Sequence, residues 1–369
     1  MNKKFLLIAP KNRTVYNFRG DLIKSIQRQG YEVIVTGPNR DHLDKIEALG
    51  VRFFEISINK NGLNPFADLH YLWALKKLMR IEKPDVSLGY TIKPVIYGAI
   101  AAKMAGVKRI NSMITGVGYL FTSQSVKVKL LRFFVSFLYR LGLKAADAVI
   151  FQNPDDRNEF IEYQLVNREK CFVVNGSGVN MDRFGKATFP DRITFFMLSR
   201  VMFSKGIREY LTAAEIVKKK YPDVRFMLLG AVEDIQDSLQ REDLAPYIAE
   251  GVVDYYGETT DIRPYVEQCS VYVLPSYREG TPRTVLEAMA MGRPIITTDV
   301  PGCRETVENG KNGFLIPIKD VNSLVEKMEW FIQRPDQISV MGESSFELCK
   351  RKFDVSRVNK DMIKICLLD

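Results

Sequence analysis

The chain has 369 residues, 46% of them hydrophobic and 26% charged, which is typical of a globular protein long enough for two domains. Its five cysteines are scattered without a C-x-x-C pair and it has only two histidines, which argues against a disulfide scaffold and a histidine-based metal centre. No apolar run is long enough to span a bilayer, and MNKKFLLIAPKN has the pattern of a first strand rather than a signal peptide, so we expect a cytosolic protein.

The net charge of +9 is unevenly distributed along the chain. Residues 1–190 carry +13 and residues 191–369 carry −4, and residues 101–150 contain 8 basic residues against 1 acidic residue. A basic half suggests nucleic-acid binding, but neither a basic-aromatic RNA motif nor a helix-turn-helix pattern accompanies it. We therefore predict no nucleic-acid partner, and favour an anionic membrane surface or a pyrophosphate-bearing lipid.

The first half alternates between expected strands and helices. Apolar runs predict strands at 4–10, 31–38, 51–57, 85–93 and 107–116, and amphipathic patterns predict helices at 17–30, 41–50, 67–83 and 91–106. The alternation starts again in the second half, with strands at 192–200, 224–230, 251–259 and 270–276 separated by helices. Strands and helices that take turns predict two α/β domains, each a doubly wound parallel sheet. Polar residues and a proline place the boundary near 186–190.

One strand–loop–helix stretch concentrates the chemistry. The apolar run Val271–Leu274 predicts a buried strand, residues 277–282 a loop, and a helix follows from Arg283 with Val285, Leu286, Met289 and Ala290 on its apolar face. A helix N-terminus favours an anion. Glu279 and Glu287 are eight positions apart, and we expect both at the rim of one cleft that suits a nucleotide-sugar. The alternative is a solvated helix start with acidic residues.

The segment from Glu279 to Glu287 resembles the E-x7-E signature of glycosyltransferase family 4, and the resemblance extends from Leu274 to Pro317. A second block, Met197 to Glu215, resembles the strand–loop–helix of the same family that contains a basic pair. The resemblance implies a retaining, metal-independent enzyme of the GT-B fold, with two Rossmann-like domains facing each other across a cleft. It implies an acceptor-binding domain at 1–187, a nucleotide-sugar-binding domain at 188–352, and a C-terminal helix at 353–369 that crosses back onto the first domain.

Other motifs do not support a dinucleotide or metal site. Gly116-Val-Gly118 and Gly176-Ser-Gly178 lack the third glycine of a dinucleotide fingerprint, and the chain has no Asp-x-Asp metal motif. Asp155-Asp156 at a predicted helix start is expected to be a cap. Since no metal ion is expected to neutralise a leaving diphosphate, Arg200 and Lys205 are the candidates for stabilising it. The alternative is that they are two solvated cations in a loop.

The resemblance assigns the remaining roles. It implies that Glu279 accepts hydrogen bonds from the transferred sugar and that Glu287 holds the ribose hydroxyls. Catalysis is assigned to Glu279, Arg200 and Lys205, with front-face attack and no dedicated base. Backbone contacts to the sugar and diphosphate are expected from Gly280, Thr281, Pro282 (which itself has no N–H), Thr284 and Val285. A uracil is expected to contact the stretch that contains Tyr256 and Glu258. Acceptor or phosphate contacts are expected from Arg19 and the loop from Gly116 to Tyr119.

The chain departs from the family in two places. Residues 11–18 are not glycine-rich, and neither His42 nor His70 falls in the loop 115–119, so we expect His70 at the surface. An N-x-F-R helix start, an L-N-P-F stretch and a T-G-x-G-Y loop resemble the branch that extends undecaprenyl-diphosphate-linked glycans, where N-acetylgalactosamine, galactose and glucose donors occur. The resemblance implies a UDP-sugar donor. The transferred sugar, the receiving hydroxyl and the oligomeric state stay open.

Residues 125–147 mix lysines and arginines with Leu, Phe and Val. Such a segment can lie in an anionic bilayer interface, or it can be a core helix with a solvated basic face. With a lipid-linked acceptor we expect a peripheral protein on the inner face of the cell membrane. Two alternatives stay open for the function: a GT-B UDP-sugar epimerase, and a catalytically silent GT-B module that binds glycans.

Overall fold

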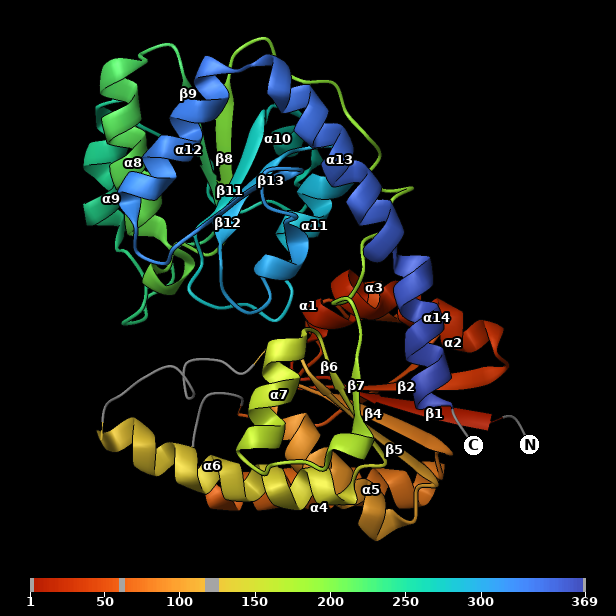
Figure 1. The fold of residues 1–369 in the computed structure, drawn as a ribbon. Coiled ribbons are helices and arrows are strands. Elements are labelled where there is room, and N and C mark those ends of the chain that lie inside the picture. Colours follow the sequence, from red (N-terminus) through yellow and green to blue (C-terminus); the bar gives the residue numbers. More distant parts are fainter. Residues whose placement is uncertain (1–2, 60–63, 117–125, 368–369) are drawn as a thin grey trace. The chain divides into compact units, whose positions relative to one another are not determined.

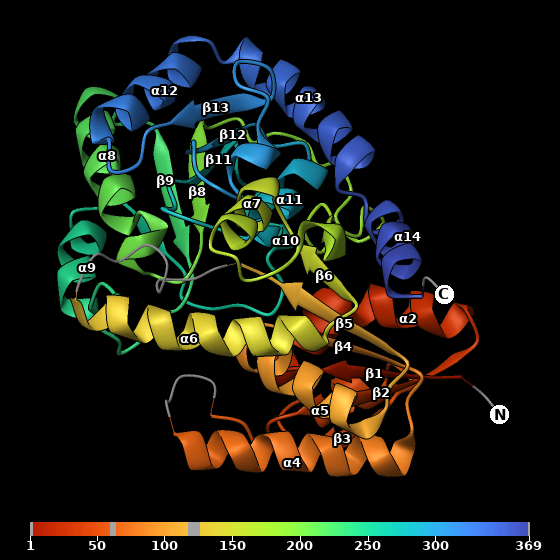
Figure 2. The same cartoon turned by 60° about the horizontal axis from the view of Figure 1, so that its bottom comes forward.

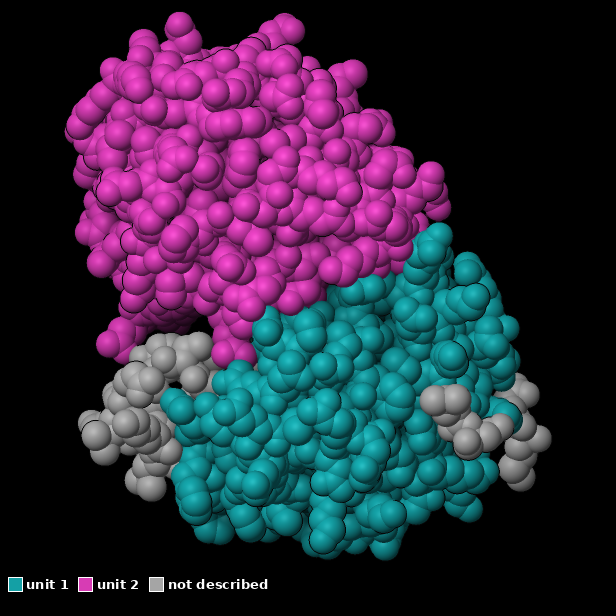
Figure 3. Space-filling model, in the orientation of Figure 1, with its two compact units in different colours: residues 1–177, 355–369 teal, residues 178–354 magenta. Residues whose placement is uncertain are grey.

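The computed structural model describes residues 3–59, 64–116 and 126–367, and the side chains of 126–131 are not among those described. The chain forms two compact units, one of residues 1–177 with 355–369 and the other of residues 178–354 (Figures 1 and 3).

The first unit contains a parallel sheet of seven strands in the order β3-β2-β1-β4-β5-β6-β7. The strands are β1 (Lys3–Ile8), β2 (Tyr31–Gly37), β3 (Arg52–Glu55), β4 (Val86–Tyr90), β5 (Arg109–Ile114), β6 (Ala148–Phe151) and β7 (Cys171–Val173). The helices are α1 (Asn12–Thr14), η1 (Val15–Arg19), α2 (Gly20–Arg28), α3 (Leu43–Glu47), α4 (Pro65–Glu82), η2 (Pro94–Gly98), α5 (Ala99–Ala105), α6 (Val126–Ala145), α7 (Pro154–Glu162), η4 (Arg168–Lys170) and α14 (Val355–Cys366).

Both faces of this sheet are covered, because successive residues of a buried strand point to opposite sides. Leu6 and Ile8 pack with residues of α4, α5 and α6. Phe5 and Leu7 pack with residues of α2 and α14 on the other face. Figure 2 shows α4, α5 and α6 lying along one side of the sheet. The unit is therefore a three-layer, doubly wound domain.

The second unit contains a parallel sheet of six strands in the order β10-β9-β8-β11-β12-β13. Its strands are β8 (Thr194–Leu198), β9 (Arg225–Leu229), β10 (Asp254–Tyr255), β11 (Val271–Leu274), β12 (Ile295–Thr298) and β13 (Gly313–Ile316). Its helices are η5 (Phe203–Lys205), α8 (Ile207–Lys220), α9 (Arg241–Ala249), α10 (Arg263–Glu267), α11 (Arg283–Ala290), η6 (Arg304–Thr306), α12 (Val321–Gln333) and α13 (Asp336–Lys352). Helix α8 packs against α12, and α11 packs against α13. Figure 1 shows these two pairs on opposite sides of the sheet.

The chain enters the second unit between Ser177 and Gly178, earlier than the boundary placed at 187/188 from the sequence. Val179 and Phe184 are buried in the core of the second unit. The N–H of Val179 donates to the carbonyl oxygen of Phe353 at 2.8 Å, where the chain leaves this unit. The polar residues around 186–190 lie inside the unit and do not mark its edge.

The chain then returns to the first unit as α14. Val358, Met362, Ile365 and Cys366 of this helix are buried in the first unit's core. The guanidinium of Arg109 at the start of β5 donates to the carbonyl oxygen of Ile365 at 3.0 Å. The second unit is thus inserted into the chain of the first.

Two helix starts differ from the sequence expectation. The helix expected at 17–30 is preceded by helical turns from Asn12, because α1 and η1 run directly into α2. Asn153, and not the Asp155–Asp156 pair, caps α7: its side chain accepts from the N–H of Asp156 at 2.7 Å, and its amide donates to the Asp156 carboxylate at 3.0 Å. Asn153 precedes Pro154, which is favoured at the first helical position, so the cap lies before the proline and not after it.

Candidate functional site

Two loops meet at the carboxyl edge of the second sheet because β8 and β11 are adjacent parallel strands. One loop follows Leu198 and leads into α8, and the other follows Leu274 and leads into α11. The N–H of Tyr277 donates to the carbonyl oxygen of Ser204 at 2.9 Å, and Ser276 Oγ lies 3.2 Å from the same oxygen. The carboxyl edge is where open α/β sheets bind ligands.

The two loops bring Lys205 and Glu279 into direct contact. Lys205 Nζ lies 2.5 Å from Glu279 Oε1, and the side chains are 20% and 17% exposed. The hydroxyl of Ser276, which is fully buried, donates to the same oxygen at 2.9 Å. Among the described residues, Glu279 Oε2 has no hydrogen-bond partner. The pair is therefore held at one carboxylate oxygen and can offer the other to a ligand.

Two glycines allow the close approach of these loops. A Cβ on Gly206 would lie 2.2 Å from the carbonyl oxygen of Pro275, and a Cβ on Gly302 would lie 2.3 Å from that of Glu279. Both glycines have positive φ, +77° and +82°, which is costly for other residues. The loop that follows β12 thus packs directly under the backbone of Glu279.

The helix that begins at Arg283 agrees with the sequence expectation. Pro282 is its N-cap, in an extended conformation with φ −71° and ψ 108°. The N–H of Val285 donates to the carbonyl oxygen of Pro282 at 3.1 Å, so this one of the predicted backbone donors is used within the helix. Gly280 and Pro282 are buried, and Thr281 and Thr284 are half-buried next to them.

Glu287 lies inside this helix, one turn after Arg283. The Arg283 Nε donates to Glu287 Oε1 at 3.1 Å, and both side chains are 12% exposed. Burial raises the pKa of the Glu287 carboxyl above its ordinary value of 4.5, and the charge of Arg283 opposes the shift. Glu287 is thus an enclosed carboxylate next to a guanidinium, in a different environment from the Glu279–Lys205 pair.

Arg200 is paired with a residue that the sequence did not suggest. Its Nη1 lies 3.0 Å from Glu233 Oε2, and the two side chains are 49% and 37% exposed. Arg200 lies in the same β8–α8 loop as Lys205, while Glu233 follows β9, the neighbouring strand. An exposed pair of this kind is weak, so Arg200 can exchange Glu233 for an anionic ligand at little cost.

The residues expected to contact a uracil follow β10. The Tyr256 hydroxyl accepts from Arg225 Nη2 at 2.5 Å, and its ring stands edge-on to Tyr265 with centroids 5.0 Å apart. The N–H of Gly230 donates to the carbonyl oxygen of Gly257 at 2.7 Å. Glu258 is exposed. The stretch lies after the edge strand β10, which is separated from β11 by the two strands β9 and β8.

In the first unit, Arg19 is 4% exposed and its guanidinium carbon lies 5.1 Å from the centroid of the Tyr90 ring. Gly116, two residues after the end of β5, has φ +133°. The rest of the predicted contact loop, from Val117 to Tyr119, lies outside the described residues. His70 is exposed on α4, as expected.

The described parts of the chain contain no cluster of three His, Cys, Asp or Glu side chains that could hold a metal ion. Within the same ranges, no helix combines the length and the hydropathy that crossing a bilayer requires.

Several residues of the site were not predicted from the sequence. Ser276 and Glu233 carry no signal, because a single serine or an ion-pair partner distant in sequence has no motif of its own, and Arg283 was not predicted as a partner of Glu287. Buried Glu209, which accepts from the Tyr277 hydroxyl at 2.7 Å, also went unnoticed. The i, i+4 spacing of Arg283 and Glu287 is a signal that could have identified their pair.

Two protein-family models match the chain. The model described as "Glycosyl transferase 4-like" matches residues 4–153, and the model "Glycosyl transferases group 1" matches residues 192–334. The two matches fall within the first and second units respectively.

Curated relatives match along most of the chain. It is 28% identical over 334 residues to the N,N'-diacetylbacillosaminyl-diphospho-undecaprenol alpha-1,3-N-acetylgalactosaminyltransferase of Campylobacter jejuni, covering 87% of each chain. It is 26% identical over 307 residues to the UDP-Gal:alpha-D-GlcNAc-diphosphoundecaprenol alpha-1,3-galactosyltransferase of Escherichia coli, covering 79% of this chain and 77% of the relative.

Solved structures show the same fold. A glycosyltransferase from Rickettsia africae superposes with a TM-score of 0.80 at 18% identity, covering 100% of this chain and 99% of the other. HepE of Anabaena, solved with UDP and glucose, superposes with a TM-score of 0.80 at 16% identity and covers 100% of both chains. The two doubly wound units therefore have the GT-B architecture.

Proposed function

The chain belongs to the family 4 glycosyltransferases, and from this we propose that it moves a hexose or N-acetylhexosamine from a UDP-sugar to an undecaprenyl-diphosphate-linked saccharide. The enzyme acts in the assembly of a cell-surface polysaccharide or glycan, with retention of anomeric configuration and without a metal. Support for the donor and acceptor comes from two relatives that are named for transfer to diphospho-undecaprenol saccharides, one of them from UDP-galactose.

The observation that carries the proposal is the Lys205–Glu279 contact at 2.5 Å, at the carboxyl edge of the second sheet. When the sugar–phosphate bond breaks, negative charge grows on the nucleoside diphosphate. Lys205 at this edge stabilises that charge, and Arg200 joins it by leaving Glu233. A group that binds the developing charge better than the ground state lowers the barrier.

The two glutamates have separate tasks in this proposal. Glu279 accepts hydrogen bonds from hydroxyls of the transferred sugar through Oε2, while Oε1 stays bonded to Lys205 and Ser276. Glu287 holds the ribose hydroxyls. Backbone groups of Gly280, Thr281 and Thr284 meet the sugar and diphosphate, and Tyr256 and Glu258 lie at the uracil. The leaving phosphate takes the proton of the acceptor hydroxyl, so that no protein base is needed.

The first unit binds the acceptor and, we propose, lies on the inner face of the membrane. The described part of α6 exposes Phe133 (72%), Phe137 (50%) and Leu141 (44%), with Arg140 and Lys144 also exposed. Exposed aromatic and aliphatic side chains interleaved with cations suit an anionic interface. The Lys127 and Lys129 side chains lie outside those described.

The test is a panel of UDP-sugars with EDTA present, offered with a short undecaprenyl-diphosphate-linked saccharide, while UDP release and product mass are followed. Transfer from one donor in EDTA, with the anomeric configuration of the product read by NMR, supports the proposal and names the sugar. UDP release without a glycosylated product points to an epimerase or hydrolase. Tight UDP binding without turnover points to a silent binding module, and activity that needs a metal contradicts the mechanism.

A further inference from the structure

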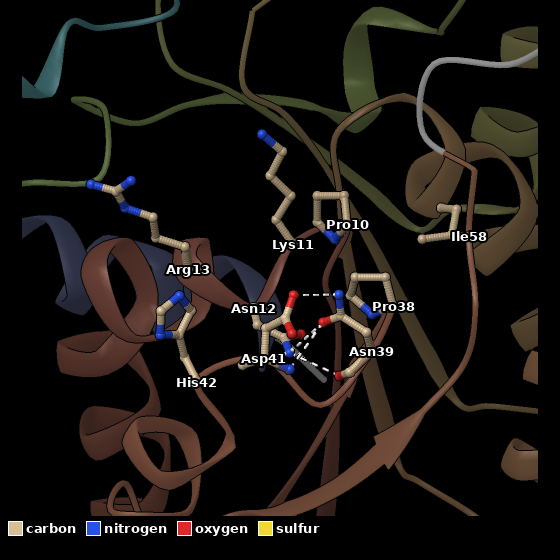
Figure 4. A pocket seen from close by; sticks show the side chains of 9 residues that line it. All are labelled: Pro10, Lys11, Asn12, Arg13, Pro38, Asn39, Asp41, His42 and Ile58. Carbon is tan, nitrogen blue, oxygen red and sulfur yellow. Dashed lines mark hydrogen bonds between the residues drawn. The ribbon is translucent and has the colours of Figure 1, made fainter. Parts of the chain in front are cut away.

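A pocket of about 360 Å³ lies at the carboxyl edge of the first unit's sheet (Figure 4). Its lining comes from the segments that follow β1 and β2, with one residue from the segment after β3. The lining residues are Pro10, Lys11, Asn12, Arg13, Pro38, Asn39, Asp41, His42 and Ile58. The volume is in the range of small-molecule sites.

The floor of the pocket is locked by Asn12, which is 3% exposed. Its amide nitrogen lies 2.8 Å from the carbonyl oxygen of Asn39, 3.1 Å from Asn39 Oδ1 and 2.7 Å from the carbonyl oxygen of Asp41. A Cβ on Gly37 would lie 2.0 Å from Asn12 Oδ1. The Asn12 side chain can therefore adopt this position only because the last residue of β2 is a glycine. The two loops are tied together, and the pocket is formed before any ligand arrives.

The walls and the rim differ in chemistry. Pro10, Pro38 and Ile58 supply apolar surface, and Figure 4 shows the Lys11 and Arg13 side chains extending to the same side, with Asn12 between them turned towards Asn39 and Asp41. Asp41 accepts from Asn39 Nδ2 at 2.6 Å. The lining thus contains two cationic side chains, Lys11 and Arg13, and one carboxylate, that of Asp41. The ring of His42 stands edge-on to that of Tyr16, with centroids 5.8 Å apart.

We propose that this pocket binds the diphosphate and the adjoining sugar of the acceptor, an inference that rests on the proposed function. Lys11 and Arg13 donate charge-assisted hydrogen bonds to the diphosphate, which are stronger than neutral ones. Asp41 accepts hydrogen bonds from sugar hydroxyls, Asn39 donates to them or accepts from them, and the proline rings pack against the apolar face of the sugar. A nucleoside diphosphate has the same charged group, so the test must separate the two sources.

The experiment compares wild type with Lys11→Ala and Arg13→Ala, and uses Arg40→Ala as the control. Arg40 is exposed in the loop after β2, between two lining residues, and does not itself line the pocket. The probe is a short-chain prenyl-diphosphate-linked saccharide. Its binding is measured by titration calorimetry without donor, and its KM is measured with saturating UDP-sugar. The KM of the UDP-sugar is measured in parallel with saturating acceptor, and inorganic pyrophosphate serves as a competitor.

We expect Lys11→Ala and Arg13→Ala each to weaken binding of the probe about tenfold and to raise its KM to match. The KM of the UDP-sugar, and every constant of Arg40→Ala, should change less than twofold. Pyrophosphate should compete with the probe in wild type and less in the two variants.

Other outcomes separate this inference from the proposed function. If the two variants lose probe binding while wild type transfers no sugar from any UDP-sugar, the result would support the pocket as a diphosphate site and contradict the proposed transferase function. A raised KM for the UDP-sugar with unchanged probe binding would assign the pocket to the nucleotide and overturn the inference. Unchanged binding in both variants, or no binding of the probe to wild type, would overturn it as well.

Discussion

Lys205 and Glu279 form an ion pair at 2.5 Å although 74 residues separate them in the sequence. Strands β8 and β11 are neighbours in the sheet, so the loops that follow them start side by side. Ser276 belongs to the same loop as Glu279, and its Oγ lies 2.9 Å from Glu279 Oε1 and 3.2 Å from the carbonyl oxygen of Ser204 in the other loop. A cation and a carboxylate at one sheet edge are thereby held in place before a substrate is bound.

Replacing Lys205 with methionine should lower kcat by about 10²–10³-fold, because a donor aimed at developing charge is lost while the apolar stem remains. The KM for the UDP-sugar should change much less. The measurement is steady-state UDP release at saturating acceptor. Lys219→Met is the matched control, since Lys219 forms an exposed ion pair with Glu215 at 2.7 Å in the same unit. Equal kcat in the two variants would contradict the role of Lys205.

Arg200→Ala should lower kcat/KM for the UDP-sugar about tenfold or more, because a charge-assisted contact to the diphosphate is lost. Glu233→Gln should leave kcat unchanged and lower this KM slightly, because Arg200 no longer has to leave a carboxylate. Initial rates over a range of UDP-sugar concentrations measure both effects. If Glu233→Gln is as impaired as Arg200→Ala, the ion pair itself is needed, and the exchange of partners is wrong.

The pH dependence of donor use should report on Glu287. Since burial raises the pKa of this carboxyl above 4.5, lowering the pH protonates Glu287 earlier than an ordinary glutamate. The protonated group accepts hydrogen bonds from ribose less well, so kcat/KM for the UDP-sugar should fall as the pH drops through the raised pKa. Glu287→Gln, which stays neutral at every pH, should have a lower kcat/KM for the UDP-sugar at neutral pH and should not show this decrease towards acid pH. An acid limb that persists in the variant would assign the titration to another group.

Gly206→Ala should destabilise the second unit, because its Cβ would lie 2.2 Å from the carbonyl oxygen of Pro275 at φ +77°. Gly251→Ala separates the effect of the steric clash from that of the left-handed conformation. Gly251 has φ +67°, but no atom lies within 4 Å of a Cβ added to it. The left-handed conformation alone costs roughly 1–2 kcal/mol, and Gly206→Ala should cost clearly more. Thermal melts of both variants measure the difference. Equal shifts in Tm would mean that the loops can move apart freely.

Binding to liposomes should depend on α6. Neutralising Lys127, Lys129 and Arg132 together should reduce flotation with anionic vesicles, and Phe133→Ser with Phe137→Ser should reduce it further, because charge and apolar contact add. Neutral vesicles are the control for charge. Flotation that is unchanged in both variants would rule out this helix as the contact.

Much of the fold was readable from the sequence because buried parallel strands have unmistakable apolar runs. Val271–Leu274 and the helix start at Arg283 coincide with β11 and α11. Strands β6 and β7 were not predicted, because the apolar run of β6 begins only three residues after the end of α6 and β7 has only three residues. The helical turns at Asn12 were missed because Asn12 and Thr14 have modest helix propensity, and tertiary hydrogen bonds from Asn12 fix the turn.

The site was predictable in its residues and less so in their partners. A motif placed Glu279 and Lys205 in the right loops, and their contact then depended on strand order, which no local pattern states. Arg200 bonds to Glu233 because β9 lies on the other side of β8, a relation of the same kind. The pocket beside Asn12 depends on Gly37 at the end of β2. The sequence alone does not show why a glycine is needed there, because the reason is a tertiary contact with the Asn12 side chain.

The return of α14 to the first unit has a consequence for biosynthesis. Val358, Met362, Ile365 and Cys366 fill the core of a unit whose other residues were all translated before residue 178. While the ribosome adds the next 177 residues, one face of the first sheet is therefore covered by α2 but lacks α14. The second unit can complete its core first. The first unit is thus completed after the second, and a ribosome that stalls before α14 is made leaves part of this apolar face open to chaperones and proteases.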